Sequence, residues 1–210
     1  MDLKYSTDLE QIEKLQAKHA RIAISAVLPY IYEFGMMAGP KIIVELGVSK
    51  EALANRVLEM VARRFNSIFV SCDLYDFKHV CSYEKWHFVQ SDDITFGKHF
   101  SIKSDIDLLF IDTDELYPHS GQEIETFFPL LNERCTVMFR CTNLKKELTY
   151  ENGAKTHLGW DNQRGVIRAI EEYLGDKFDE SHLFLKIVRD WEVIHYPWGA
   201  GITILRRGYS

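Results

Sequence analysis

Acidic side chains recur where apolar segments of the chain end. The first segment contains Glu45, the second ends at Asp73, the third is followed by Asp92, and the fourth ends at Asp112, with Asp114 just beyond it. One acid at a strand end is usually a turn residue or a helix cap. Acids after four successive strands are less easily explained in that way. Ligands of open α/β sheets bind beyond the carboxyl ends of the strands, so the pattern predicts a ligand site there.

The loop after the first segment indicates which ligand fits. Gly47 lets the backbone turn tightly and approach a ligand. The loop continues as Val-Ser-Lys-Glu51, so it lacks the Gly-x-Gly-x-x-Gly pattern that places a pyrophosphate on a helix N-terminus. Glu51 would repel phosphate, whereas S-adenosylmethionine carries a sulfonium cation and no phosphate. We therefore expect S-adenosylmethionine rather than NAD, with Asp73 accepting hydrogen bonds from both ribose hydroxyls.

Strands and helices that alternate along the chain must position these acids. The expected strands are residues 41–46, 67–72, 86–90, 106–112, 135–139, 191–196 and 202–206. Apolar strands that alternate with helices predict a parallel sheet covered on both faces. The join between the last two strands is too short for a helical crossover, so that pair should be antiparallel. The expected fold is a Rossmann-like three-layer sandwich with a mostly parallel seven-stranded sheet and an antiparallel C-terminal strand.

Helical spacing of apolar residues places the other elements. We expect a long N-terminal helix over 8–28 that Pro29 kinks or restarts, and a helix capped by Ser49 that runs to Phe65. Two more helices are expected over 122–132 and 163–175. The segment 142–162 has no clear periodicity and is a candidate substrate lid. These elements predict one domain over 1–210, in which a helical extension over 1–40 precedes a core over 41–210.

Composition and charge exclude several classes of protein. The chain has 210 residues, of which 46% are hydrophobic, and a net charge of −6. No basic block is present to pair with phosphates, which argues against a nucleic-acid substrate. No apolar run approaches the ~20 residues that span a bilayer, and the polar N-terminus is not a signal peptide. None of the four cysteines forms a Cys-x-x-Cys pair, and reduced thiols fit a cytoplasmic protein.

Several segments of the sequence resemble a known family. The chain is similar, over roughly residues 40–207, to class I S-adenosylmethionine-dependent methyltransferases, in the subgroup of cephalosporin-hydroxylase-like and macrocin-type sugar O-methyltransferases. Glu45-Leu-Gly47 matches the start of the family's cofactor motif. The segment 106–117, Ile-Asp-Leu-Leu-Phe-Ile-Asp-Thr-Asp-Glu-Leu-Tyr, resembles the family pattern D-x-x-x-I-D-G-D-H-x-Y. The segments 128–131, 164–166 and 201–207 also fit.

The resemblance implies an enzyme that transfers a methyl group to a hydroxyl of a small molecule or sugar. It implies that Asp112 is a cofactor-side or metal-binding acid and that Asp114 is the general base, with His119 as the alternative base. The expected cofactor contacts are Glu45, Gly47, Asp73, Asp92 and Asp112. We also expect the N-terminal helix and the segment 142–162 to shape the acceptor pocket, although the helix could instead cover the sheet or form a contact within a homo-oligomer.

The chain departs from the family pattern at several positions. Glu51 and Ala52 replace family glycines, and Glu115 replaces the family histidine. Metal-dependent relatives hold Mg²⁺ partly with acids after the fifth strand, where this chain has Arg140 and Cys141. We therefore expect any metal held by Asp112 and Asp114 to bind weakly. The rival hypotheses are a non-catalytic methyltransferase-like binding or partner subunit, and a NAD-dependent oxidoreductase. For Asp114, a helix-capping role is the alternative to the role of base.

Overall fold

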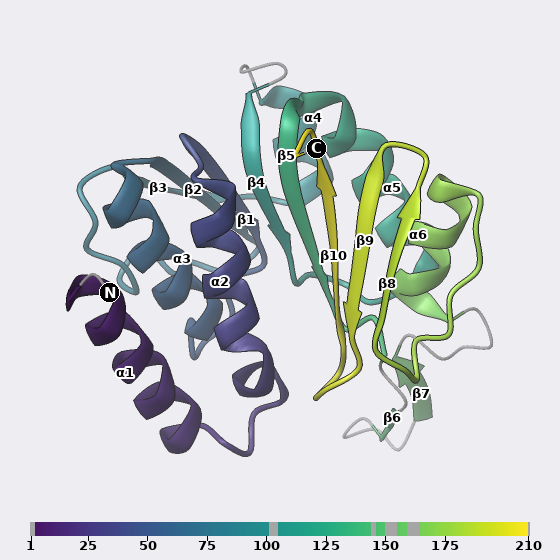
Figure 1. The fold of residues 1–210 in the computed structure, drawn as a ribbon, viewed down its shortest axis with the longest axis horizontal. Coiled ribbons are helices and arrows are strands. Elements are labelled where there is room, and N and C mark those ends of the chain that lie inside the picture. Colours follow the sequence, from purple (N-terminus) through teal and green to yellow (C-terminus); the bar gives the residue numbers. More distant parts are fainter. Residues whose placement is uncertain (1–2, 101–104, 144–145, 150–154, 159–163, 210) are drawn as a thin grey trace.

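An eight-stranded sheet forms the centre of the molecule (Figure 1). The computed structural model describes residues 3–100, 105–143, 146–149, 155–158 and 164–209. The strands of the sheet are β1 (Ile42–Leu46), β2 (Ile68–Asp73), β3 (Trp86–Gln90), β4 (Ile106–Ile111), β5 (Leu131–Arg140), β8 (Phe184–Val188), β9 (Trp191–Tyr196) and β10 (Ile202–Arg207). Their spatial order is β3-β2-β1-β4-β5-β10-β9-β8.

The direction of the strands confirms the expected fold class. Strands β1 to β5 form parallel pairs, and β10 lies antiparallel to both β5 and β9. The sheet has eight strands rather than seven, because β8 pairs with β9 at one edge. The strand β8 was not predicted because it is an edge strand whose apolar residues are exposed; Leu185 and Ile187 are more than half accessible. It therefore lacks the alternation of a half-buried strand.

Helices cover both faces of the sheet, as expected for a three-layer sandwich (Figure 1). They are α1 (Leu3–Lys18), α2 (Leu28–Ala38), α3 (Leu53–Phe65), α4 (Asp93–His99), α5 (Tyr117–Phe127) and α6 (Gly165–Leu174). Apolar residues of α1, α2 and α3 form one core with one face of the sheet, and those of α4, α5 and α6 form a second core with the other face. Most residues of β1, β2 and β4 are therefore buried on both faces of the sheet.

The N-terminal helix differs from the expectation. The helix α1 ends at Lys18 rather than near residue 28, and a 3-10 helix, η1 (Ala23–Val27), leads into α2. Pro29 lies in the first turn of α2, where its missing N–H costs no helical hydrogen bond. The proline thus restarts a helix, while the apolar spacing across residues 19–27 comes from a buried 3-10 turn.

Two other helices begin elsewhere than predicted, and a third was not predicted. The helix α3 begins at Leu53 with Ala52 as its N-cap residue, so Ser49 does not cap it. The predicted helix over 122–132 is wrong in its bounds, because α5 covers 117–127, the 3-10 helix η2 (Phe128–Leu130) follows, and β5 begins at Leu131. The helix α4 was not predicted at all; its Asp92 cap accepts a hydrogen bond from the Thr95 N–H.

The segment 142–162 lies largely outside the described residues. Its described part includes two short strands, β6 (Lys146–Thr149) and β7 (Lys155–Leu158), which pair with each other in antiparallel fashion. The lid hypothesis for this segment stays a prediction. Among the described residues, no helix is both long enough and apolar enough to cross a bilayer.

Candidate functional site

The carboxyl ends of β1, β2, β4 and β5 meet at one edge of the sheet. The register aligns Leu46 of β1 with Cys72 of β2 on one side and with Ile111 of β4 on the other. Ile111 in turn lies opposite Phe139 of β5. The residues that follow these strands are therefore neighbours in space, and they make up the candidate site.

Gly47 allows the ends of β1 and β4 to approach closely. Its φ of +81° lies in the left-handed region, and a Cβ atom at this position would lie 2.1 Å from the carbonyl oxygen of Asp112. The Asp112 N–H donates to the Leu46 carbonyl over 2.8 Å, which fixes this approach. The space that the glycine leaves free is thus filled by protein backbone. Position 47 therefore requires glycine because of backbone packing. Contact between Gly47 and a cofactor stays a prediction.

Asp73 joins the loops after β1 and β2. Its Oδ2 accepts a hydrogen bond from the Val48 N–H at 2.8 Å, and its Oδ1 accepts one from the Tyr75 N–H at 2.9 Å. The residue is half-buried. Each carboxylate oxygen has two lone pairs, so both oxygens can still accept a hydrogen bond from a hydroxyl. The two backbone donors hold the carboxylate in place at the carboxyl end of β2, and its contact with a ribose stays a prediction.

Glu45 lies inside the protein rather than in the site. Its side chain is fully buried, and its Oε2 accepts hydrogen bonds from Asn55 Nδ2 at 2.6 Å and from Ser71 Oγ at 2.6 Å. Burial raises the pKa of the Glu45 carboxyl to about 8, against the lowering effect of these two hydrogen bonds. The carboxyl therefore carries a proton at neutral pH. Direct contact with a cofactor would require it to leave this network.

A guanidinium occupies the centre of the site. Arg140, the last residue of β5, donates from Nε to Asp112 Oδ1 over 2.7 Å, and from Nη2 to the sulfur of Cys141 over 3.2 Å. Both side chains of the ion pair are less than one-sixth exposed. Burial alone would lower the pKa of Arg140, but the attraction of Asp112, Cys141 and Glu115 together with the Asp112 hydrogen bond raises it overall. Arg140 Nη1 is buried and has no acceptor among the described residues.

The Arg140–Asp112 ion pair argues against the metal site expected at Asp112 and Asp114. Mg²⁺ requires several oxygen ligands at about 2.0–2.1 Å, including one or two carboxylates. Here the Asp112 carboxylate already binds a cation, and the next residues along β5 offer a guanidinium and a thiol. Asp114 is exposed, and its Oδ1 accepts a hydrogen bond from the Leu116 N–H at 2.9 Å, which closes a turn before α5. The residues present do not fit a Mg²⁺ ion between Asp112 and Asp114.

The remaining predicted residues lie where α4 and α5 begin. Asp92 is exposed and caps α4. His119 lies in the first turn of α5 rather than in a loop, and its Nε2 lies 2.9 Å from Oδ2 of the buried Asp93. This hydrogen bond raises the pKa of His119. Glu123, one turn further along α5, places its Oε1 3.8 Å from the same nitrogen.

Three residues at this edge were not predicted as site residues: Asp93, Glu123 and Arg140. The spacing of His119 and Glu123, four residues apart on one helix, is a signal that correct bounds for α5 would have revealed. The sequence did not single out Asp93 because it follows another acid, Asp92. Which of the two side chains is buried depends on the residue at which α4 begins, and that start was not predicted. Arg140 was noted only as a missing metal ligand, and its partner follows from the β4–β5 register.

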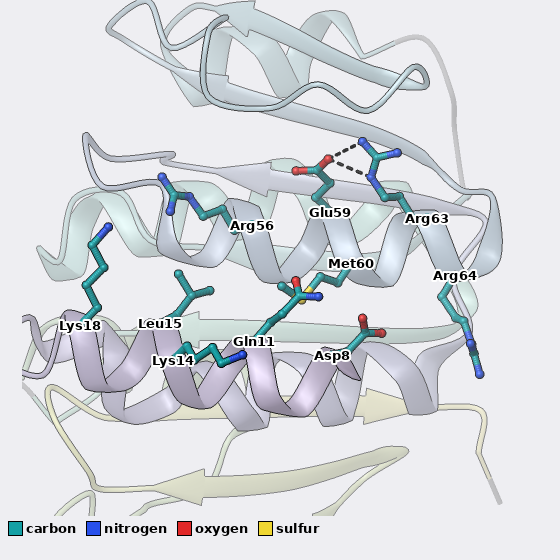
Figure 2. A pocket seen from close by; sticks show the side chains of 10 residues that line it. All are labelled: Asp8, Gln11, Lys14, Leu15, Lys18, Arg56, Glu59, Met60, Arg63 and Arg64. Atoms are coloured by element: carbon teal, nitrogen blue, oxygen red, sulfur yellow. Dashed lines mark hydrogen bonds and ion pairs between the residues drawn. The ribbon is translucent and has the colours of Figure 1, made fainter. Parts of the chain in front are cut away.

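A groove of about 620 Å³ lies between α1 and α3 (Figure 2). Its lining carries five cationic and two acidic side chains: Lys14, Lys18, Arg56, Arg63, Arg64, Asp8 and Glu59. One of the acids is bound by its neighbour, since Arg63 pairs with Glu59 at 2.6 Å. Lys18 and Arg56 lie at the end of the groove where α3 begins, which is the end nearer the carboxyl edge of β1 (Figure 2).

Comparison with known proteins identifies the fold. No protein-family model and no curated sequence matches the chain. Solved structures do match, and the fold is that of class I methyltransferases. A protein from Staphylococcus aureus described as a caffeoyl-CoA O-methyltransferase aligns with a TM-score of 0.62 and 13% identity, covering 98% of both chains.

Two further structures carry ligands. An S-adenosylhomocysteine-bound methyltransferase from Podospora anserina aligns with a TM-score of 0.61 and 13% identity, covering 99% of this chain and 89% of the other. The methyltransferase MycE of mycinamycin biosynthesis, in complex with Mg, S-adenosylhomocysteine and mycinamycin VI, aligns with a TM-score of 0.56 and 13% identity. That match covers 86% of this chain and 49% of MycE. At these identities the comparison establishes the fold.

Proposed function

We propose that the protein is an S-adenosylmethionine-dependent O-methyltransferase that acts on a hydroxyl of a small molecule or sugar. The observation that carries the proposal is the Asp73 carboxylate, which two backbone donors fix at the carboxyl end of β2. A carboxylate there can bind both hydroxyls of a ribose, and the loop after β1 has no glycine pattern for a pyrophosphate. The fold shared with methyltransferases, one of them bound to S-adenosylhomocysteine, supports the same cofactor.

The charges around Arg140 fit a cationic cofactor that carries a carboxylate. Asp112 neutralises the guanidinium, and Glu115 adds a nearby acid whose pKa is raised by burial. A sulfonium group therefore does not face a net positive charge. The Nη1 of Arg140 is buried without an acceptor among the described residues, so a hydrogen bond to the carboxylate of the cofactor's methionine part would require the groups that cover it to move aside. Gly47, Asp92 and Asp112 remain the other proposed cofactor contacts.

Methyl transfer needs alignment and a base. When bound, the cofactor supplies an electrophilic methyl group. The rigid strand ends align the acceptor hydroxyl with it at ~3 Å, and a side chain takes the hydroxyl proton. We propose Asp114 for this role because it is exposed just beyond β4, while the Leu116 N–H holds its position. His119 is the alternative, but its Nε2 already contacts Asp93. No step is assigned to Mg²⁺.

The acceptor is proposed to be small. A net charge of −6 disfavours nucleic acid, and MycE, which shares the fold, is described in complex with mycinamycin VI. The groove between α1 and α3 supports the prediction that the N-terminal helix shapes acceptor binding, because α1 lines it and its Lys18 lies with Arg56 at the end where α3 begins, after the loop that follows β1. We further propose a cytoplasmic protein, supported by four free cysteines.

A binding experiment tests the proposal. Asp73→Ala should weaken the affinity for S-adenosylhomocysteine, measured by titration calorimetry, by about 1–3 kcal/mol, which is the loss expected for a hydrogen-bond partner in a polar site. Asp76→Ala is the matched control, since Asp76 is an exposed acid in the same loop that accepts only from the Lys78 N–H. Equal affinity of the two variants would remove Asp73 from the cofactor site.

One observation favours a second candidate, a methyltransferase-like subunit without catalysis. The Arg140–Asp112 ion pair lies at the strand ends and occupies the carboxylate that the family resemblance assigns to a cofactor or metal. A non-catalytic subunit predicts no heat of binding with S-adenosylhomocysteine. The enzyme predicts binding and, once an acceptor is found, turnover.

A further inference from the structure

A cluster of three metal-ligating side chains lies apart from the Arg140–Asp112 pair. Asp93, His119 and Glu123 each offer one ligand atom, and these atoms all lie within 4.8 Å of one another. Asp93 comes from the start of α4, and the other two come from α5. The cluster therefore joins two helices whose apolar residues share one core on the same face of the sheet.

The distances within the cluster suit a small cation. His119 Nε2 lies 2.9 Å from Asp93 Oδ2 and 3.8 Å from Glu123 Oε1. Ligands at about 2.1 Å from a central ion lie roughly 3.0–3.5 Å from each other, so the two distances from His119 Nε2 are each within a few tenths of an ångström of this range. Both carboxyl residues are buried, with 9% of the Asp93 side chain and 1% of the Glu123 side chain exposed.

Other groups already orient the two carboxylates. The Ile94 N–H donates to Asp93 Oδ1 at 2.9 Å, and the Thr113 hydroxyl donates to Glu123 Oε1. Hydrogen bonds of this kind commonly hold metal ligands in place. They direct Asp93 Oδ2 toward the histidine, and they leave Glu123 Oε2 buried without a donor among the described residues.

The buried Oε2 of Glu123 is the observation that points to a ligand. Glu123 also lies within hydrogen-bonding reach of the Asp93 carboxyl group. Two buried carboxyl groups in contact need either a shared proton or a cation between them. Asp92 and Asp114 add further negative potential at His119. The acids around the cluster therefore create a negative electrostatic potential that favours a bound cation.

We propose that Asp93, His119 and Glu123 bind a divalent transition-metal ion. One imidazole and two carboxylates favour Zn²⁺ or Mn²⁺ over Mg²⁺ or Ca²⁺, which take oxygen ligands. The ion would link α4 to α5 beside the carboxyl edge, and so fix one wall of the candidate site. The proposal does not require a cofactor, and the only side chain that it shares with the methyltransferase proposal is His119, the alternative base.

Metal titration of the whole chain tests the site. Protein stripped with EDTA is titrated with Zn²⁺ or Mn²⁺ alone by calorimetry, and the bound metal is counted by mass spectrometry. We expect one ion per chain and a rise in melting temperature that EDTA reverses. Wild-type protein that binds no ion, or whose melting temperature does not respond, overturns the proposal whatever the variants do.

Matched variants locate the bound ion. Loss of a group that only orients a ligand costs about 10–100-fold in metal affinity, so Glu123→Gln and His119→Gln should each lose ~100-fold or more. The controls are Glu125→Gln, an exposed acid on the same helix, and His99→Gln, an exposed histidine whose Nδ1 lies 2.8 Å from the Thr95 carbonyl oxygen. Affinity that falls equally in the controls, or that survives both ligand variants, would mean adventitious surface binding and reject the site.

Discussion

Glu45 should make the stability of the protein depend on pH. Its carboxyl is fully buried, and burial raises its pKa from 4.5 to about 8. A folded-state pKa above the unfolded value means that the folded state binds the proton more tightly. The stabilisation is complete below about pH 4.5 and is lost as the pH rises through 8. A shift of roughly 3.5 units corresponds to about 5 kcal/mol over the whole range.

The accessible part of this loss lies between pH 6 and 8.5. With the same two pKa values, linkage gives a decrease of about 2.5 kcal/mol in the free energy of unfolding over this interval. Urea unfolding at several pH values measures it. Glu45→Gln keeps the shape of the side chain and an oxygen that accepts from Asn55 and Ser71, but it has no proton to lose. The free energy of unfolding of this variant should therefore fall by about 2.5 kcal/mol less than that of the wild type between pH 6 and 8.5.

A matched variant controls for other groups that titrate in the same pH range. Glu51→Gln changes an exposed acid in the following loop and should keep the wild-type slope of stability against pH. If Glu45→Gln shows the same slope as wild type and Glu51→Gln, the Glu45 carboxyl is already ionised in the folded protein. The buried network would then have to hold a charge, and our account of it would be refuted.

Three further variants test packing, charge and catalysis. Gly97→Ala should destabilise by about 1–3 kcal/mol because the new Cβ lies 2.5 Å from Thr126, whereas Gly121→Ala, with no atom within 4 Å, should not; melting temperatures compare them. Arg140→Met should cost about 3 kcal/mol in urea unfolding by leaving Asp112 unpaired, and adding Asp112→Asn should recover much of it. Asp114→Asn can keep the turn to Leu116, so turnover should fall by ~10²–10⁴-fold with an unchanged melting temperature; a lower melting temperature with normal turnover would indicate a structural role.

The sheet was predictable from sequence because its strands are short apolar runs between helices. The antiparallel C-terminal strand followed from the short join between residues 196 and 202. The strand β8 was not predictable in this way, since an exposed edge strand has no buried face to impose a pattern. The helix α4 has only seven residues, and its start depends on a side-chain cap.

The positions of the site residues were predictable only in part. The strand-end acids were expected to share one edge, and the parallel register places them there. Their individual roles depend on partners from distant segments. Glu45 turns toward α3 because alternate residues of β1 face opposite sides, and Asn55 meets it there. The partner of Asp112 lies 28 residues away on β5, and no local pattern indicates that pair.

Titration calorimetry with S-adenosylhomocysteine and with NAD⁺ tests the central claim most directly. Our account predicts saturable, one-to-one binding of S-adenosylhomocysteine to the wild-type chain, with no heat of binding for NAD⁺, because the loop at Gly47 has no pyrophosphate-binding pattern. Absence of binding to S-adenosylhomocysteine in folded protein, or saturable binding of NAD⁺ in its place, would contradict the account.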